Sequence, residues 1–274
     1  MPARGRSARP IYVEARIRAP MDLLWELTQV PEAHERWDAR FTRIRYAADA
    51  EDTVEGDAED RSGVVRFRYW LGLSAGPALT GTGVTTAERH RADGSRISAL
   101  RFAADGGLSP LQEGSGYWRY TPAGSPADAY VLFATGYDYR GWRVPGGVWL
   151  DRWFVRPFVG WLTAWSFDRL RLWAEHGVPP ERSLLRAVGE AAARLGGAAA
   201  IGAAIGAMTD SMTDAVTDSR AGVIAGAGCA VLALLLSLLV PPSALTPAAR
   251  RCARRPDRTR PARPPRLLDT LETP

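Results

Sequence analysis

The chain has 274 residues, which is enough for one large domain or for a domain with an appendage. A composition of 46% hydrophobic and 24% charged residues is that of an ordinary globular protein and excludes disorder throughout. The formal charge of +5 lies after residue 240, where eight arginines outnumber three carboxylates. Residues 1–240 are therefore neutral, which argues against a nucleic-acid-binding domain.

The N-terminal part of the chain predicts one strand followed by two helices. Residues 1–10 are rich in arginine and proline, and we expect them to be disordered. Ile11–Ala19 alternates apolar and polar side chains, which is the pattern of a strand with one buried face. Apolar residues then recur at helical spacing from Met21 to Thr28, and a second short helix runs from Pro31 to about Trp37.

Six more strands and a long helix complete this part of the chain. Glycine-containing turns separate the strand-like segments, which are Phe41–Ala47, Val64–Leu71, Thr80–Arg91, Arg96–Ala103, Gly114–Thr121 and Tyr130–Arg140. Gly147–His176 predicts a helix in which tryptophans fall at multiples of four residues and, with neighbouring leucines and phenylalanines, form one broad apolar face. Pro157 lies inside this pattern and predicts a kink or a split.

Residues 182–240 are rich in alanine and glycine, and their most apolar stretch predicts a membrane helix. Ala221–Val240 has 20 residues without a charge and would measure about 30 Å as a helix, the thickness of a bilayer's hydrocarbon core. A buried core helix is the alternative. Leu195–Met208 is also apolar, but its 14 residues are too short to span alone. Each stretch holds a GxxxG motif that lets helix backbones approach closely in lipid: Gly202 with Gly206, and Gly222 with Gly226.

The positions of the charges favour a helical hairpin in the membrane. Basic flanks stay on the cytoplasmic side, and residues 241–274 form an arginine-rich and proline-rich tail that we expect to be disordered. If a single helix crossed, residues 11–180 would lie outside the cell without a signal peptide to direct them there. Two crossings keep both the domain and the tail in the cytoplasm, at the inner or cell membrane.

The order of strand, two helices, six strands and long helix resembles that of the START-like superfamily, also called SRPBCC, which includes polyketide cyclase/dehydrase-like proteins. Residues similar to the N-terminal signature of this family are Ala19-Pro20, Leu24-Trp25 and Trp37. Gly114–Tyr120 and Trp165–Trp173 are similar to a bacterial branch with membrane-attached members. The resemblance covers residues 11–177 and implies an α+β helix-grip fold, in which a curved antiparallel sheet wraps the long helix around an apolar cavity.

The resemblance also implies that aromatic side chains line this cavity, a surface suited to a lipid, an isoprenoid or an aromatic polyketide. The residues that we expect in the cavity lining are Tyr46, Phe67, Tyr69, Trp118, Tyr137, Trp153, Trp161 and Trp165. At each of these positions the alternative is a side chain that only fills the core.

The chain offers little catalytic chemistry. It has no recognised hydrolase, phosphate-binding or metalloprotease motif, its three histidines lie far apart, and two cysteines are too few for a metal cluster. We therefore expect no metal and no cofactor. Asp138 either points into the cavity as an acid–base group or, as we favour, pairs with Arg119 or Arg140. Cys252 has arginine neighbours, but as a tail thiol without a partner we expect it to be inert.

These observations predict a membrane-tethered, non-catalytic binding or carrier protein whose partners are a hydrophobic small molecule and the membrane, with no nucleic acid. One alternative is an enzyme of the cyclase/dehydratase kind. Another is a membrane adaptor or sensor that assembles as a homo-oligomer through the glycine-rich hairpin. A buried carboxylate or histidine with a strongly shifted pKa in the cavity would favour the enzyme. A cavity filled by tryptophan side chains would favour the adaptor.

Overall fold

The computed structural model describes residues 10–46, 64–71, 79–106, 111–141, 146–212 and 220–257, together with residues 109, 264, 265, 268, 271 and 274. The chain divides into two compact units. The first comprises residues 1–180 and 248–274, and the second comprises residues 181–247.

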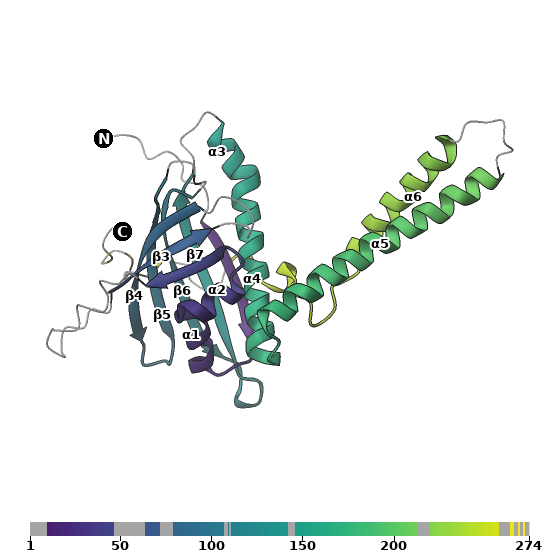
Figure 1. Cartoon of the computed structure of the whole chain (residues 1–274). Helices are drawn as coiled ribbons and strands as arrows, with labels where there is room; N and C mark the ends of the chain where they lie inside the picture. The colour runs from purple at the N-terminus through teal and green to yellow at the C-terminus, as the bar shows by residue number, and fades with distance from the viewer. Residues whose placement is uncertain are drawn as a thin grey trace. The chain divides into compact units, whose positions relative to one another are not determined.

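The first unit is built around a single antiparallel sheet (Figure 1). Its described strands are β1 (Ile11–Ile17), β2 (Phe41–Tyr46), β3 (Val64–Leu71), β4 (Leu79–His90), β5 (Arg96–Ala104), β6 (Glu113–Ala123) and β7 (Tyr130–Arg140). Their spatial order is β1-β7-β6-β5-β4-β3-β2, so that the strands from β2 to β7 form one meander and β1 returns to pair with β7. The expected succession along the chain of one strand, two helices and six further strands is confirmed.

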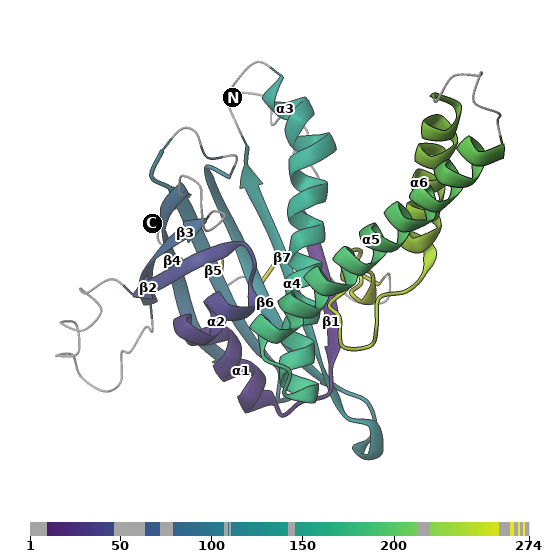
Figure 2. The same cartoon turned by 45° about the vertical axis from the view of Figure 1, so that its right-hand side comes forward.

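Three helical segments cover one face of this sheet, which we call the inner face (Figure 2). Between β1 and β2 lie α1 (Met21–Gln29) and α2 (Pro31–Trp37). After β7 comes α3 (Gly147–Leu150), which continues through a π-helical turn at Asp151–Val155 into α4 (Arg156–His176). Val159, Ala164 and Phe167 of α4 join the buried cluster of the sheet, and the α+β helix-grip class is thereby confirmed.

Pro157 interrupts the long helix as predicted, although the chain does not split there. Pro157 occupies the first turn of α4 and has no N–H to donate to a carbonyl of the preceding turn. The interruption takes the form of the π-helical turn immediately before α4. At the other end Gly177 adopts a φ of 61° and donates its N–H to the Trp173 carbonyl, which ends the helix.

The expectation of a disordered tail is corrected for residues 248–253, which pack against α4 and β1. Asp168 of α4 is fully buried, and its carboxylate accepts a 2.8 Å hydrogen bond from the Ala248 N–H and a 2.9 Å bond from Arg251. Ala253 forms a two-bond antiparallel bridge with Glu14 on the free edge of β1. A buried carboxylate needs donors, and the small residues of the tail bring them close to the helix.

Cys252 belongs to this packed segment and is buried, with its thiol 3.3 Å from the Ala164 carbonyl oxygen. Burial raises the pKa of Cys252 to about 12, with a further contribution from the Asp168 carboxylate. The thiol therefore stays protonated and unreactive at neutral pH. Further along the tail, Leu268 and Leu271 pack on Val84 and Ala99, on the outer face of the sheet.

The second unit is a pair of helices, α5 (Pro180–Met212) and α6 (Arg220–Leu239). The apolar stretch that looked too short to span belongs to α5, a continuous helix of 33 residues. By length and composition both helices could cross a membrane, as Pro180–Ser211 and Gly222–Leu239. Residues 213–219, which hold part of the polar linker between the two apolar stretches, lie outside the described residues.

The two GxxxG motifs pack against each other within one chain. A Cβ atom added to Gly202 would lie 2.7 Å from the Gly226 carbonyl oxygen, and one added to Gly226 would lie 2.6 Å from the Gly202 carbonyl oxygen. Gly206 and Gly222 are similarly close, at 3.1 Å for a Cβ on Gly206. These glycines therefore allow the backbones of α5 and α6 to approach closely, as predicted. Assembly of several copies through the same motifs stays a prediction.

Candidate functional site

Aromatic rings on the inner face of the sheet lie directly over glycines of the neighbouring strands. Phe67 of β3 pairs with Gly83, which pairs with Phe102 of β5, which in turn pairs with Gly114. A Cβ atom at Gly83 would overlap the ring of Phe67, and one at Gly114 would overlap the ring of Phe102. Glycine is required at these two positions because any side chain would lift the ring off the sheet. The rings thus form an aromatic surface across β3 to β5, which we call the aromatic floor.

Tyr69 is the most buried ring of this floor, with 3% of its surface exposed. It contacts Phe41, Phe67 and Phe102, with ring centroids 5.8 to 6.4 Å apart. Its phenol oxygen is buried and has no hydrogen-bond partner among the described residues. Burial raises the pKa of Tyr69 above its usual value, so the hydroxyl keeps its proton and can donate a hydrogen bond. An unsatisfied buried hydroxyl is costly, and a ligand could relieve that cost.

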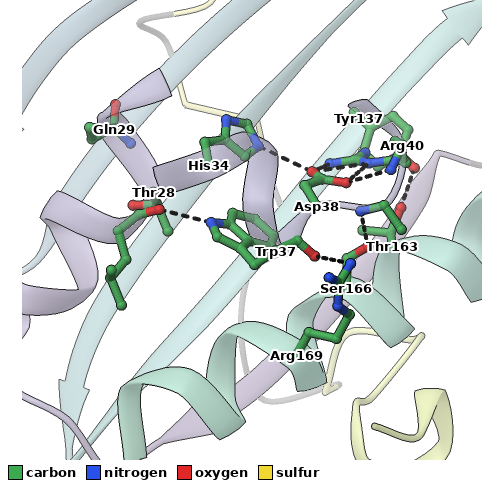
Figure 3. A network of polar contacts seen from close by, with 12 residues as sticks. Thr28, Gln29, His34, Trp37, Asp38, Arg40, Tyr137, Thr163, Ser166 and Arg169 are labelled. Atoms are coloured by element: carbon green, nitrogen blue, oxygen red, sulfur yellow. Dashed lines mark hydrogen bonds and ion pairs between the residues drawn. The ribbon is translucent and has the colours of Figure 1, made fainter. Parts of the chain in front are cut away.

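A buried ion pair lies at the end of α2 (Figure 3). It adjoins the floor because Arg40 lies over the ring of Phe41, which contacts Tyr69. Asp38 is fully buried, and its carboxylate accepts hydrogen bonds from Arg40 Nε at 2.9 Å and Arg40 Nη2 at 2.6 Å. His34 Nε2 lies 3.1 Å from the same carboxylate. Tyr137 hydrogen-bonds to Arg40 and lies 2.8 Å from Thr163 of α4. The network therefore links α2, β7 and α4.

The charge states in this network follow from burial and pairing. Burial alone would raise the pKa of Asp38, but the Arg40 guanidinium and the bond to His34 hold that pKa well below its usual range. Burial lowers the pKa of His34, against a smaller opposing effect of the Asp38 carboxylate. Asp38 is therefore an anion and His34 is neutral at pH 7. Both oxygens of Asp38 are already engaged, which leaves no free carboxylate at this place for proton transfer.

Acidification is expected to destabilise the first unit through His34. The histidine pKa in an unfolded chain is about 6.5, and the folded value is lower. Below about pH 6.5, His34 binds a proton in the unfolded state but not in the folded state. The free energy of unfolding therefore falls, by at most about 1.4 kcal/mol per pH unit. Urea unfolding followed by tryptophan fluorescence between pH 7 and pH 5 measures this slope. The substitution His34→Gln should flatten the slope, and an unchanged slope in that variant would contradict the assignment.

The half of the interior beneath α4 is filled by large side chains. Trp37 is fully buried and lies 6.4 Å from Trp118 and 6.1 Å from Phe167, measured between ring centroids. Phe133 stacks on Phe167 at 4.5 Å. Trp37 also donates its indole N–H to the Leu27 carbonyl at 2.8 Å, which fixes the ring in this position. The buried cluster that contains these rings reaches the aromatic floor, because Phe102 packs against it.

The residues expected to line a cavity fall into three groups. Phe67 and Tyr69 lie together on the aromatic floor. Trp118 and Tyr137 are buried in the filled half, and Trp165 packs half-buried against it. Tyr46, Trp153 and Trp161 are exposed, and the Tyr46 hydroxyl donates to the Gln29 carbonyl. The two exposed tryptophans do not face the sheet because Val159, Gly160, Thr163 and Ala164 occupy that side of α4.

Sequence reasoning missed the ion pair of Asp38 and Arg40. Two charged residues just after a helix are ordinarily exposed, and the only signal for this place was Trp37 in the family signature. The expected ion pair of Asp138 is present with a different partner, since Arg156 of α4 lies 2.8 Å from Asp138. Among the described residues, no group of three or more His, Cys, Asp or Glu side chains could hold a metal ion.

Comparisons with known proteins gave one curated relative and no family. No family model matches the chain. It is 36% identical over 180 residues to the uncharacterized membrane protein YndG of Bacillus subtilis (strain 168). The alignment covers 66% of this chain and 62% of YndG, so the chain spans about three fifths of that relative's length.

Solved structures similar to the chain have low sequence identity and low TM-scores. A protein from Rhizobium leguminosarum is 16% identical, with coverage of 61% of this chain and 94% of its own and a TM-score of 0.33. The Zhui aromatase/cyclase from Streptomyces sp. R1128 is 15% identical, with coverage of 60% and 96% and a TM-score of 0.34. Ara h 8.0201 is 13% identical, with coverage of 58% and 97% and a TM-score of 0.33. Likenesses at this level carry no conclusion about function.

Proposed function

We propose that this chain is a membrane-tethered binding protein that holds an apolar small molecule, such as a lipid, an isoprenoid or a polyketide, without transforming it. Two observations support the tether. Both α5 and α6 are long and apolar enough to cross a bilayer, and YndG, which shares 36% identity over 180 residues, is named a membrane protein. As a hairpin, these helices leave the helix-grip unit on the cytoplasmic side, where the arginine-rich tail also lies. A bilayer would supply apolar ligands at high local concentration.

The aromatic floor is the proposed binding surface, and the observation that carries the proposal is the buried phenol of Tyr69. Ligand pockets are mostly apolar and contain a few polar groups that fix orientation. Phe67 and Phe102 supply the half-buried apolar area, and the Tyr69 hydroxyl supplies a donor without a partner among the residues described. This combination suits an apolar molecule with one acceptor oxygen, such as a ketone, ester or quinone.

The state of the buried ionisable groups supports binding without catalysis. Asp38 and His34 have the shifted pKa values that would favour an enzyme. The shift of Asp38, however, reflects its pairing with Arg40 and stabilises the anion. A general acid would need a raised carboxyl pKa, and a general base would need a free lone pair. We therefore assign this pair a structural role beside the binding surface.

The direct test is mass spectrometry of small molecules extracted from the full chain purified out of membranes. We expect an apolar compound to be recovered with the wild-type protein and to be depleted in the variant Tyr69→Phe. The variant Tyr120→Phe is the matched control, since the Tyr120 hydroxyl bonds Thr28 at 2.6 Å and Gln29 at 2.9 Å and lies away from the floor. Recovery of nothing above background with the wild-type chain would refute the binding function.

The same two variants make a stability prediction for protein stripped of small molecules. Tyr69→Phe removes an unsatisfied buried hydroxyl and should raise the free energy of unfolding by about 1 kcal/mol. Tyr120→Phe breaks two hydrogen bonds and should lower it by about 1 kcal/mol. Urea unfolding followed by tryptophan fluorescence measures both. If Tyr69→Phe destabilises the stripped protein, its hydroxyl is satisfied within the chain and is not the ligand's donor.

A membrane adaptor is the second candidate, because Trp37 and Trp118 fill the half of the interior beneath α4. An adaptor would need no small molecule on the aromatic floor. The extraction experiment separates the two functions, since an adaptor should yield no compound that depends on Tyr69.

A further inference from the structure

The outward side of the long helix carries a row of large apolar side chains, which we call the aromatic ridge. Its members are Val148, Trp149, Trp153, Phe154, Phe158 and Trp161, and each exposes between 44% and 80% of its surface. Two pairs of rings are in contact, with centroids 5.5 Å apart for Trp149 and Phe154 and 6.3 Å apart for Phe158 and Trp161. So many large exposed apolar side chains close together in one helix mark an interaction surface.

The ridge is not a by-product of core packing. Beside the ridge, the side of α4 that faces the sheet is built from smaller residues, including Val159, Thr163 and Ala164, and the large ring of Phe167 is buried only further along the helix. A helix that only had to cover the sheet would carry polar residues on its other side. Here Trp153, Phe158 and Trp161 are exposed instead. Their place in the sequence, from the start of α3 to the first half of α4, confines the ridge to one end of the long helix.

The charges beside the ridge are arranged so that it carries no unpaired carboxylate among the described residues. Arg156 pairs with Asp151 at 2.7 Å and with Asp138 at 2.8 Å. The Tyr139 hydroxyl donates to the other oxygen of Asp151 at 2.7 Å. Arg152 is exposed within the ridge, with its guanidinium carbon 5.6 Å from the centre of the Trp153 ring. The surface is therefore apolar and rich in tryptophan, and Arg152 gives it a positive charge.

We propose that the aromatic ridge docks into the headgroup region of a lipid bilayer that contains anionic lipid. Tryptophan prefers this interface because its ring is apolar while its N–H can bond to headgroups or water, and an arginine there can reach lipid phosphates. The proposal rests on the membrane tether proposed above, which begins only four residues after α4 and keeps the domain within reach of the lipid surface. A second copy fits less well, because a two-fold contact would bring the same positive Arg152 face against itself.

The test uses the full chain with Cys229→Ala, reconstituted into vesicles of phosphatidylcholine with phosphatidylglycerol. Buried Cys252 does not react with a label, so an environment-sensitive fluorophore attaches only to an introduced cysteine. Phe158→Cys places the fluorophore on the ridge. Ala127→Cys is the matched control in the exposed turn between β6 and β7, at the opposite end of β7 from α3. We expect lipid carrying a quencher just below its headgroup to reduce emission from position 158 and not from position 127.

Three outcomes would overturn the proposal. In the first, the lipid-borne quencher reduces emission from both positions by the same fraction, in vesicles that retain the chain after an alkaline carbonate wash. That result would refute docking while leaving the tether intact. Disulfide formation between two copies at position 158 without quenching would assign the ridge to a second copy. Loss of the chain in the wash would refute the tether itself and docking with it. Arg152→Glu should also weaken quenching in the anionic vesicles more than in vesicles of phosphatidylcholine alone.

Discussion

Replacing Asp38 by alanine is expected to lower the free energy of unfolding of the helix-grip unit by about 3–5 kcal/mol. The substitution leaves the Arg40 guanidinium buried without the carboxylate that accepts two of its hydrogen bonds. It also removes the partner of His34 and the acceptor for the Arg40 N–H. Urea unfolding followed by tryptophan fluorescence measures the loss in the full chain, because all ten tryptophans precede residue 180 and report on the first unit alone.

Two comparisons show whether the loss arises from the buried charge. The double variant Asp38→Ala with Arg40→Met removes both charges and should recover most of the stability, since a missing pair costs far less than a single unpaired ion. Asp105→Ala removes a partner of Arg68 from a pair at 3.9 Å that is largely exposed, and it should cost less than about 1 kcal/mol. Equal losses in Asp38→Ala and Asp105→Ala would mean that the Asp38 pair is open to water.

Local patterns were sufficient to predict the helices and strands of the first unit, whereas their helix-grip arrangement was implied by the resemblance to the START-like superfamily. Alternation along β1 and the helical spacing from Met21 to Thr28 are properties of neighbouring residues, and the left-handed Gly177 ends the long helix through a contact with its own last turn. The packed segment at residues 248–253 could not be predicted in this way. Its partners, Asp168 and Glu14, lie far away in the sequence, and its arginines resemble those of a disordered tail.

The membership of the candidate site could be predicted only in part. The alternation in β3 correctly placed Phe67 and Tyr69 on one face. The sequence predicts one broad apolar face for the long helix, which includes the tryptophan row, and we expected Trp153, Trp161 and Trp165 of this row to line the cavity. The sheet lies so close to α4 that Gly160, Thr163 and Ala164 fit there, which turns Trp153 and Trp161 outward. Residue type could not decide this, because the distance between helix and sheet is a property of the whole fold.

Replacing Asp168 by asparagine is expected to release the tail segment from α4 and to make Cys252 reactive. The Asp168 carboxylate accepts hydrogen bonds from the Ala248 N–H, from Arg251 and from Arg171 at 2.7 Å. A hydrogen bond to a charged group contributes about 1.5–3 kcal/mol, so losing one should raise the population of the opened segment about 10- to 100-fold. The rate at which a thiol reagent modifies Cys252, measured in a Cys229→Ala background, should rise by the same factor.

The modification rate of Cys252 can rise through local opening of the tail segment or through global unfolding, and a control variant separates the two. Arg250→Ala changes an exposed side chain in the same segment and should leave the modification rate of Cys252 unchanged. If Asp168→Asn opens the segment alone, tryptophan fluorescence stays native while the thiol reacts. A rate equal to that of the parent chain would show that Ala253 pairing with Glu14 holds the segment without Asp168. A rate that rises only with loss of native fluorescence would place Asp168 in the core of the unit, where its donors stabilise the whole fold and not the tail alone.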